Sequence, residues 1–158
     1  MTIVKAIPKG LHTLTPEIIV RDASKAIEFY KNAFNAKVNR IHYGPDNRSV
    51  IHAELKIGDS ILMLNDEFPE MNALSPLSIG GTSTTINIYC EDVDELFNRA
   101  VSAGATVTMP LMDQFWGDRY GKLKDPFGHQ WSLAKRLKNL SDEEMIEAGK
   151  AAFAEMGK

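Results

Sequence analysis

The chain has a single cysteine and no long apolar run, and each absence limits what the protein can be. With Cys90 as the lone cysteine among 158 residues, no intramolecular disulfide can form, which is typical of a reducing compartment. No apolar stretch approaches the roughly 18 residues that a transmembrane helix needs, and residues 1–9 contain no apolar core of a secretion signal. The sequence therefore predicts a cytoplasmic protein with no membrane partner.

An excess of basic residues is also lacking. The chain has 18 Lys and Arg against 21 Asp and Glu, a formal net charge of -3 at pH 7. Proteins that bind nucleic acid through its phosphates need clustered positive charge, so no nucleic-acid partner is expected. What is present is ordinary for a globular protein: 44% hydrophobic and 25% charged residues, in a length that suits one domain or two small modules.

The chain repeats itself with an offset of about seventy residues. Residues 18–38 and 88–107 each read as an apolar strand, an aspartate, an amphipathic helix, a turn residue and a β-branched strand, and Asp22 aligns with Asp92. Self-similarity of this kind indicates two copies of one supersecondary unit. The carboxylate of Asp22 is suited to cap the helix that follows it.

Three more strands follow the predicted helix in each half. The fold class is therefore predicted as α+β, with two tandem βαβββ modules that form a cupped sheet. The predicted strands are 14–20, 37–43, 49–57 and 60–65 in the first half, and 106–111, 118–124 and 130–134 after the helix of the second half.

These elements give a domain organisation. One domain, 1–136, contains module one (about 12–66), a Pro-, Ser- and Gly-rich linker (about 67–83) and module two (about 84–136). A C-terminal tail, 137–158, contains a helix that opens with a capping box from Ser141 to Glu144. This helix is expected to dock on its own domain or on a partner subunit. Its apolar positions are Met145, Ile146, Ala152, Phe153 and Met156.

Three segments, 18–34, 86–107 and 115–134, carry a resemblance to a known family. In this order they resemble the vicinal-oxygen-chelate superfamily (glyoxalase, bleomycin resistance and extradiol dioxygenase proteins), and the last two are most similar to its PhnB-like branch. The resemblance implies paired βαβββ modules around one pocket, and usually a homodimer. The superfamily includes isomerases, lyases, dioxygenases, thiol transferases and non-catalytic drug-binding proteins, so the fold leaves the function open.

The resemblance also implies where a metal would bind. Catalytic members hold a divalent ion with His, Glu or Gln on the first and last strands of each half. The matching positions in this sequence are Thr15, Thr85, Ser132 and either Leu62 or Met63. Hydroxyl and thioether groups are poor ligands for Zn, Ni, Fe or Mn. We therefore expect no metal at the family positions and no cofactor, and a divalent metal only if other residues bind it.

Strand alternation selects other candidates for chemistry. Glu17, His52 and Glu54 are predicted to share the sheet face opposite the first helix. Two carboxylates and one histidine suit a relocated metal site, or a Glu/His acid–base pair. The alternative is a hydrogen-bonded polar surface in which Glu54 pairs with Lys122 or Lys124.

The loop at residues 115–119 adds aromatic candidates. Its Phe-Trp pair precedes a glycine and an arginine, a combination that can stack on a planar or anionic ligand or anchor a lid or dimer interface. The remaining histidines, at positions 12, 42 and 129, are expected to be surface, edge or turn residues. The predicted ligand-binding residues are Thr15, Glu17, His52, Glu54, Met63, Thr85, Asn87, Trp116, Arg119, Tyr120, Lys122 and Ser132.

Two functions are compatible with these residues. The first is a PhnB-like protein that binds a small organic molecule in the pocket between the modules without the family's metal. The second is a metal-dependent isomerase, lyase or dioxygenase that uses Glu17, His52 or Glu54 as relocated ligands or as the catalytic pair. A methyltransferase is not favoured, because no Gly-rich loop follows the first strand to hold a nucleotide-like cofactor. Whether the protein is an enzyme stays open.

Overall fold

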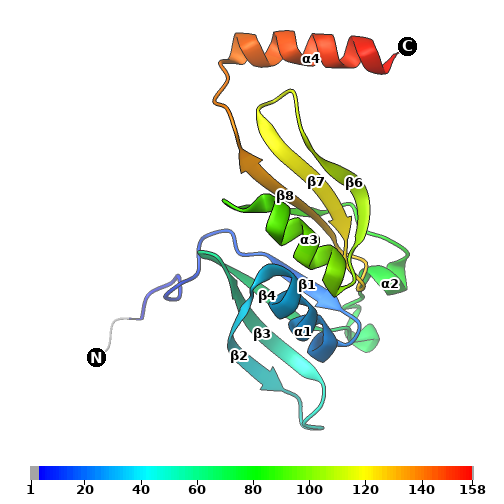
Figure 1. Ribbon diagram of the computed structural model, residues 1–158. Helices are drawn as coiled ribbons and strands as arrows, with labels where there is room; N and C mark the ends of the chain where they lie inside the picture. The colour runs from blue at the N-terminus through cyan, green and yellow to red at the C-terminus, as the bar shows by residue number, and fades with distance from the viewer. Residues whose placement is uncertain (1–3, 158) are drawn as a thin grey trace. The chain divides into compact units, whose positions relative to one another are not determined.

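The protein divides into two compact units, each built on its own four-stranded sheet (Figure 1). The units are Met1–Thr82 and Ser83–Lys158, and the computed structural model describes residues 4–157 of the chain. The division falls next to the end of the predicted linker. Each unit has the order strand, helix, and three strands, and a C-terminal helix follows. The predicted α+β class with paired βαβββ modules is confirmed.

In unit 1 the strand order is β1-β4-β3-β2, with β1 parallel to β4 and the other pairs antiparallel. The parallel pair is joined through α1, which packs on one face of the sheet. The elements are β1 (Glu17–Val20), α1 (Ala23–Phe34), β2 (Lys37–Tyr43), β3 (Val50–Ile57) and β4 (Ser60–Asp66).

Helix α1 begins and ends where the sequence predicts. The Asp22 carboxylate accepts a hydrogen bond from the Lys25 backbone N–H at 3.1 Å, and Asn35 adopts the left-handed conformation (φ 55°) that ends the helix. Asp66 adds a second clasp: its two carboxylate oxygens accept from the backbone N–H groups of Ala23 (2.6 Å) and Val50 (2.7 Å). The helix start is thereby tied to β3 and β4.

Regular alternation fails at the first end of β3. The alternation that puts Glu54 on the face opposite α1 predicts Ile51 on the helix face with Ala53 and Leu55, and this is wrong: Ile51 is 49% exposed, whereas Val50 is fully buried. The pairing of β2 with β3 shifts register between His42 and Tyr43, so the regular alternation is interrupted at this end of the strand.

Unit 2 repeats this topology with the order β5-β8-β7-β6, and β5 is parallel to β8. Its helix ends at Gly104 (φ 121°), which is the turn residue of the second repeat, and Trp131 and Leu133 are buried in the core. Unlike Asp22, Asp92 makes no side-chain capping bond. The elements are β5 (Thr85–Tyr89), α3 (Val93–Ala103), β6 (Thr106–Asp113), β7 (Asp118–Lys124) and β8 (Gln130–Arg136).

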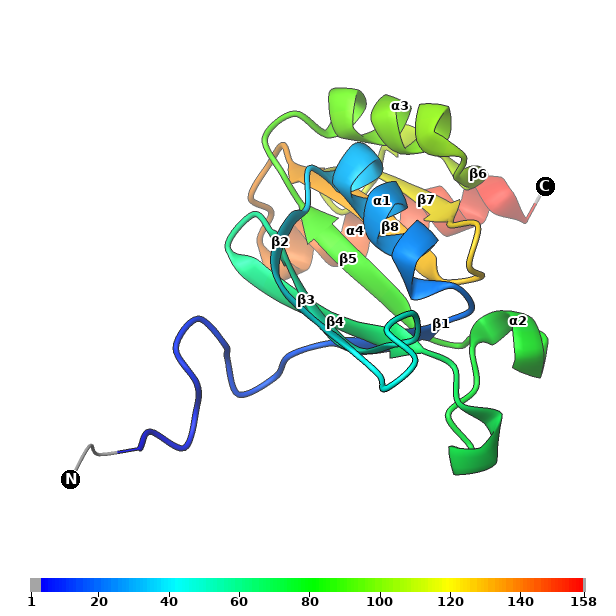
Figure 2. The same cartoon turned by 90° about the horizontal axis from the view of Figure 1, so that it is seen from below.

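The predicted linker has structure of its own. It carries two short helical turns, η1 (Pro69–Met71) and α2 (Pro76–Ile79), both visible in Figure 2. Glu67 fastens them: its carboxylate accepts from the Ser78 hydroxyl (2.6 Å), the Ser75 backbone N–H (3.0 Å) and the Arg21 guanidinium (3.0 Å). These donors, the Ser78 hydroxyl first, lower the pKa of Glu67 to about 2.

The C-terminal helix α4 (Asp142–Met156) opens with the predicted capping box. The Ser141 hydroxyl accepts from the Glu144 N–H, and the Glu144 carboxylate accepts from the Ser141 N–H. No helix within residues 4–157 combines the length and apolar character needed to cross a bilayer.

Candidate functional site

In unit 1 four side chains form a row across the sheet, on the face opposite α1. Glu17 on β1 pairs with Met63 on β4, Met63 with Glu54 on β3, and Glu54 with Arg40 on β2. Directly paired residues of neighbouring strands point to the same face, so the four share one surface. Although it lies on the side away from the helix, Glu54 is only 9% exposed.

The same register decides which residue takes the family's last-strand position in unit 1. Leu62 is 3% exposed and pairs with Leu55 in the core beneath α1. Met63 lies on the opposite face with Glu17 and Glu54. The position therefore belongs to Met63, and its thioether is a poor ligand for the metals used in this fold.

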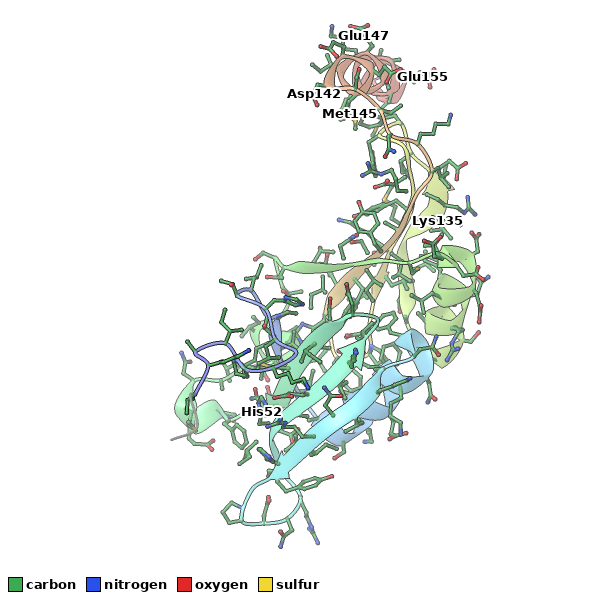
Figure 3. All side chains as sticks on the ribbon, turned by 90° about the vertical axis from the view of Figure 1, so that its left-hand side faces the viewer. His52, Lys135, Asp142, Met145, Glu147 and Glu155 are labelled. Carbon is green, nitrogen blue, oxygen red and sulfur yellow. The ribbon has the colours of Figure 1, made fainter. Side chains whose placement is uncertain are left out.

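Glu54 has two polar partners: His52, which the sequence proposed for a Glu/His pair, and Arg40, which it did not predict. The Arg40 Nε lies 3.3 Å from Glu54 Oε2, and His52 Nε2 lies 3.4 Å from Glu54 Oε1. His52, labelled on β3 in Figure 3, faces His42 across the strand pair with ring centroids 6.0 Å apart. Val38 pairs with Leu55, so regular pairing would have placed the next residue of β2, Asn39, opposite Glu54. A register shift after Val38 brings Arg40 there instead, and strand alternation alone does not reveal such a shift.

The structure does not bring Glu17 together with His52 and Glu54. Strand β4 lies between β1 and β3, so Glu17 and Glu54 are two strand spacings apart, or about 10 Å between backbones. Across residues 4–157, no three His, Cys, Asp or Glu side chains form a group that could hold a metal ion. The assembled polar group in unit 1 is therefore Arg40, Glu54 and His52.

The equivalent face of unit 2 holds Asn87, Ser132 and Lys122 in register on β5, β8 and β7. The Ser132 hydroxyl donates to Asn87 Oδ1 at 2.6 Å, and Ser132 is 2% exposed. Ser132 is at the last-strand position that the family resemblance implies, and its hydroxyl proton is already in the hydrogen bond to Asn87. A buried, hydrogen-bonded serine is poorly suited to bind a divalent metal.

The two first-strand positions are threonines in different settings. Thr85 opens β5 opposite Gln130. Thr15 precedes β1 and donates its hydroxyl proton to the His12 carbonyl oxygen at 2.9 Å. Together with Met63 and Ser132, these residues make a donor set that does not fit the family's metal.

Aromatic side chains gather at the turn between β6 and β7. The Trp116 ring meets Tyr120 edge-to-face with centroids 5.4 Å apart, and Phe115 meets Trp116 in the same way at 5.1 Å. Tyr120 pairs with Ala134, and Lys122 with Ser132, so Tyr120 lies on the same face as Ser132. The predicted candidates Trp116, Tyr120, Lys122 and Ser132 are thus on or next to one surface.

Arg119 lies apart from these residues. Its guanidinium binds both carboxylate oxygens of Asp94 on α3, at 2.8 and 2.6 Å, and Asp113 at 3.0 Å. These carboxylates, Asp94 first, raise the pKa of Arg119 above its already high usual value. Strand alternation explains the placement: Arg119 follows Asp118 and precedes Tyr120, so it points to the helix side. Its observed role is to tie α3 to β7.

A cluster that the sequence missed lies at the end of β8. Asp118 is 3% exposed and accepts hydrogen bonds from the Tyr89 hydroxyl (2.9 Å) and from the Arg136 Nε. The contact with Asp118 raises the pKa of Arg136. The sequence prediction ended this strand at Ala134, and extending the strand to Arg136 is what places the arginine directly opposite Asp118.

Comparison with known proteins identifies the family. Residues 10–133 match the profile of the Glyoxalase/Bleomycin resistance protein/Dioxygenase superfamily. An uncharacterized protein of Mycobacterium tuberculosis is 46% identical over 139 residues, which cover 85% of this chain and 81% of that protein.

Solved structures agree on the fold. TioX from Micromonospora sp. ML1 is 25% identical with a TM-score of 0.62, covering 82% of this chain and all of TioX. A Bacillus cereus protein described as a putative 3-demethylubiquinone-9 3-methyltransferase, PhnB protein, is 21% identical with a TM-score of 0.60, covering 78% of this chain and 99% of that one. The resemblance inferred from the sequence motifs is confirmed at the level of the superfamily, and the chain belongs to the glyoxalase/bleomycin resistance protein/dioxygenase superfamily.

Proposed function

We propose that this protein binds a small organic molecule on the strand faces opposite α1 and α3, without the metal that catalytic members of the superfamily use. The observation that carries the proposal is the donor set at the family's four metal positions: Thr15, Met63, Thr85 and Ser132. Ser132 weakens the case for a metal further, because its buried hydroxyl is bonded to Asn87.

The side chains on these faces suit a ligand with a flat apolar part and a polar group. Trp116 and Tyr120 supply aromatic surface in unit 2, and aromatic rings favour planar partners. In unit 1, Arg40, Glu54 and His52 offer donors and acceptors at fixed positions. We assign the protein to the PhnB-like branch on the motifs at 86–107 and 115–134, and the likeness to the Bacillus cereus PhnB protein is consistent with that assignment.

The test combines metal analysis with ligand screening. The purified chain is assayed for bound metals, and its thermal stability is then measured with a panel of aromatic drugs, with and without a chelator. A molecule that binds only the native state raises the midpoint of unfolding. We expect a stabilising ligand whose effect survives the chelator.

Two variants locate the ligand. Trp116→Ala is expected to lose most of the ligand-induced stabilisation. Tyr43→Ala, which removes a 49% exposed aromatic residue at the end of β2, is expected to keep it. Equal losses in the two variants would contradict the assignment of the aromatic surface. Stabilisation that disappears with the chelator would contradict metal-free binding.

A specific contact favours the second candidate function, a metal-dependent isomerase, lyase or dioxygenase with relocated groups. His52 and Glu54 are 3.4 Å apart on a largely buried surface, the arrangement of a histidine oriented by a carboxylate. Stoichiometric metal in the purified protein that is lost in both His52→Gln and Glu54→Gln would establish this alternative and overturn the first proposal.

A further inference from the structure

Two arginines of unit 2 lie on opposite faces of its sheet and use their donors differently. Arg119 gives Nε and both terminal nitrogens to two carboxylates. Arg136 gives Nε to Asp118, and the Tyr89 hydroxyl is its one other polar contact within residues 4–157. A guanidinium has five N–H donors in one plane. Most of the donors of Arg136 therefore have no partner in the described part of the chain.

Asp118 holds the Arg136 guanidinium in place. This carboxylate is 3% exposed, and its second oxygen accepts from the Tyr89 hydroxyl at 2.9 Å. Separating one partner from a buried ion pair is costly, so the arginine stays beside the aspartate. A side chain that is already held in one orientation loses less entropy when it binds a ligand. Arg136 is thus an oriented cation with donors to spare.

Aromatic rings lie next to this arginine. Strand β8 lies between β5 and β7, so the Tyr89 ring must cross β8 to reach Asp118. Ala134 pairs with both Tyr89 and Tyr120, and its small methyl group leaves room for the crossing ring. Tyr120 in turn meets Trp116 edge-to-face. The guanidinium therefore lies at one end of an aromatic surface, on the sheet face opposite α3.

The strand residues of this face carry an excess of positive charge, although the whole chain has a net charge of -3. Asp118 is their one carboxylate and is already paired, whereas Lys122, Lys124 and Arg136 are cations. The two lysines take part in none of the ion pairs formed within residues 4–157. A face of this kind attracts anions and disfavours cations.

We infer that the ligand is an aromatic carboxylate, whose charged group binds the terminal nitrogens of Arg136 and whose ring lies against Tyr89 and Tyr120. The inference rests on the proposed function, because it names the chemical class of the ligand proposed there. A carboxylate suits the arginine because its two oxygens match the parallel N–H bonds that a guanidinium offers. The aromatic rings suit a planar apolar body.

The test compares an acid with a neutral molecule of the same shape. Isothermal titration calorimetry on the full chain measures the dissociation constants of naphthalene carboxylate and of the corresponding carboxamide, in a buffer without other carboxylates or phosphate. We expect the acid to bind roughly tenfold or more tightly, because charge-assisted hydrogen bonds are about twice as strong as neutral ones. Its advantage should shrink at high salt.

A matched pair of variants locates the carboxylate group. Arg136→Gln should weaken binding of the acid about tenfold and change binding of the carboxamide by less than about threefold. Lys135→Gln removes the same charge from the neighbouring residue, labelled in Figure 3, which strand alternation places on the α3 side; it should leave both constants within about threefold. Arg136→Lys keeps a cation beside Asp118, so it protects the fold, and it should still weaken the acid because lysine lacks the planar fork. Circular dichroism checks that each variant is folded.

The outcomes separate this inference from the proposed function. Equal affinity for the acid and the carboxamide, or equal weakening by Arg136→Gln and Lys135→Gln, would overturn the inference and leave the proposed function standing. Binding of neither probe would also overturn the inference. The proposed function fails with it only if the panel of aromatic drugs also yields no stabilising ligand.

Discussion

Two aspartates with the same hydrogen-bonding task allow the contribution of burial to be measured. Asp125 accepts from the backbone N–H groups of Phe127 and His129 (both 2.9 Å) and from Trp131 Nε1 (2.8 Å), and it is 3% exposed. Asp46 likewise accepts three hydrogen bonds in its turn, but it is exposed. Its pKa is held at about 2, first by the Ser49 hydroxyl and then by backbone N–H groups.

We predict that Asp125→Ala costs about 3 kcal/mol or more in the free energy of unfolding. Three donors lose their acceptor, and each buried donor left unpaired costs about 1–3 kcal/mol. For a chain of this size, 3 kcal/mol corresponds to a fall of about 6–12 °C in the unfolding midpoint. Asp46→Ala is expected to change the midpoint far less, because water replaces the lost acceptor.

Urea unfolding followed by tryptophan fluorescence measures both variants. Asp125→Asn, which keeps one acceptor oxygen, should be less damaging than Asp125→Ala. If Asp125→Ala and Asp46→Ala lower the free energy of unfolding by the same amount, burial does not set the cost and the reasoning fails.

Three other predictions follow from local geometry. Gly121→Ala should lower the free energy of unfolding, measured with urea, by about 1–3 kcal/mol. A Cβ at this position would lie 2.7 Å from the Phe97 ring and 2.9 Å from Leu111 Cα. An unchanged unfolding midpoint would show that β6 and β7 can move apart without cost. Glu67→Gln should be less stable than wild type at pH 7. That difference should shrink as pH falls from 4.5 toward 2. The pKa of Glu67 is about 2 in the folded protein and 4.5 for a free glutamate, so the charged carboxylate stabilises the folded state above pH 4.5, and this stabilisation is lost as the carboxylate is protonated. A pH-independent difference would contradict the assignment. The Cys90 thiol, whose pKa is raised chiefly by burial, should react slowly with a disulfide reagent at pH 7.5 and faster as pH rises, and rapid labelling at neutral pH would contradict this.

The sequence predicted the fold well where local chemistry decides it. Asp22 and Asn35 mark the ends of α1, and the capping box opens α4 at the predicted residue. The offset between Asp22 and Asp92 indicates the duplicated module from the sequence alone. These signals depend on neighbours in the chain, so they can be read from a single sequence.

Pairs of side chains across strands were harder to predict. For Glu54 the residue pattern suggested His52 or a lysine of the second module, and it gave no sign of Arg40, which a register shift in β2 brings opposite Glu54 within unit 1. Arg119 was expected at the ligand, but its strand position turns it toward Asp94. Bulges and exact strand ends depend on tertiary packing, which the residue pattern does not encode locally.

The clasp made by Asp66 has a consequence for how the protein folds. This residue ends β4, yet it bonds the first turn of α1 and the first residue of β3, so the start of the helix gains its full set of bonds only when the last strand arrives. In unit 2 a different device, the Arg119–Asp94 pair, holds α3 to its sheet. Each half therefore has its own contacts that tie its helix to its sheet. In unit 1, the backbone amides of α1 should exchange with solvent only when the whole sheet of that unit opens. A duplicated protein with separate clasps is free to change the surface of one half while the other half keeps its stability.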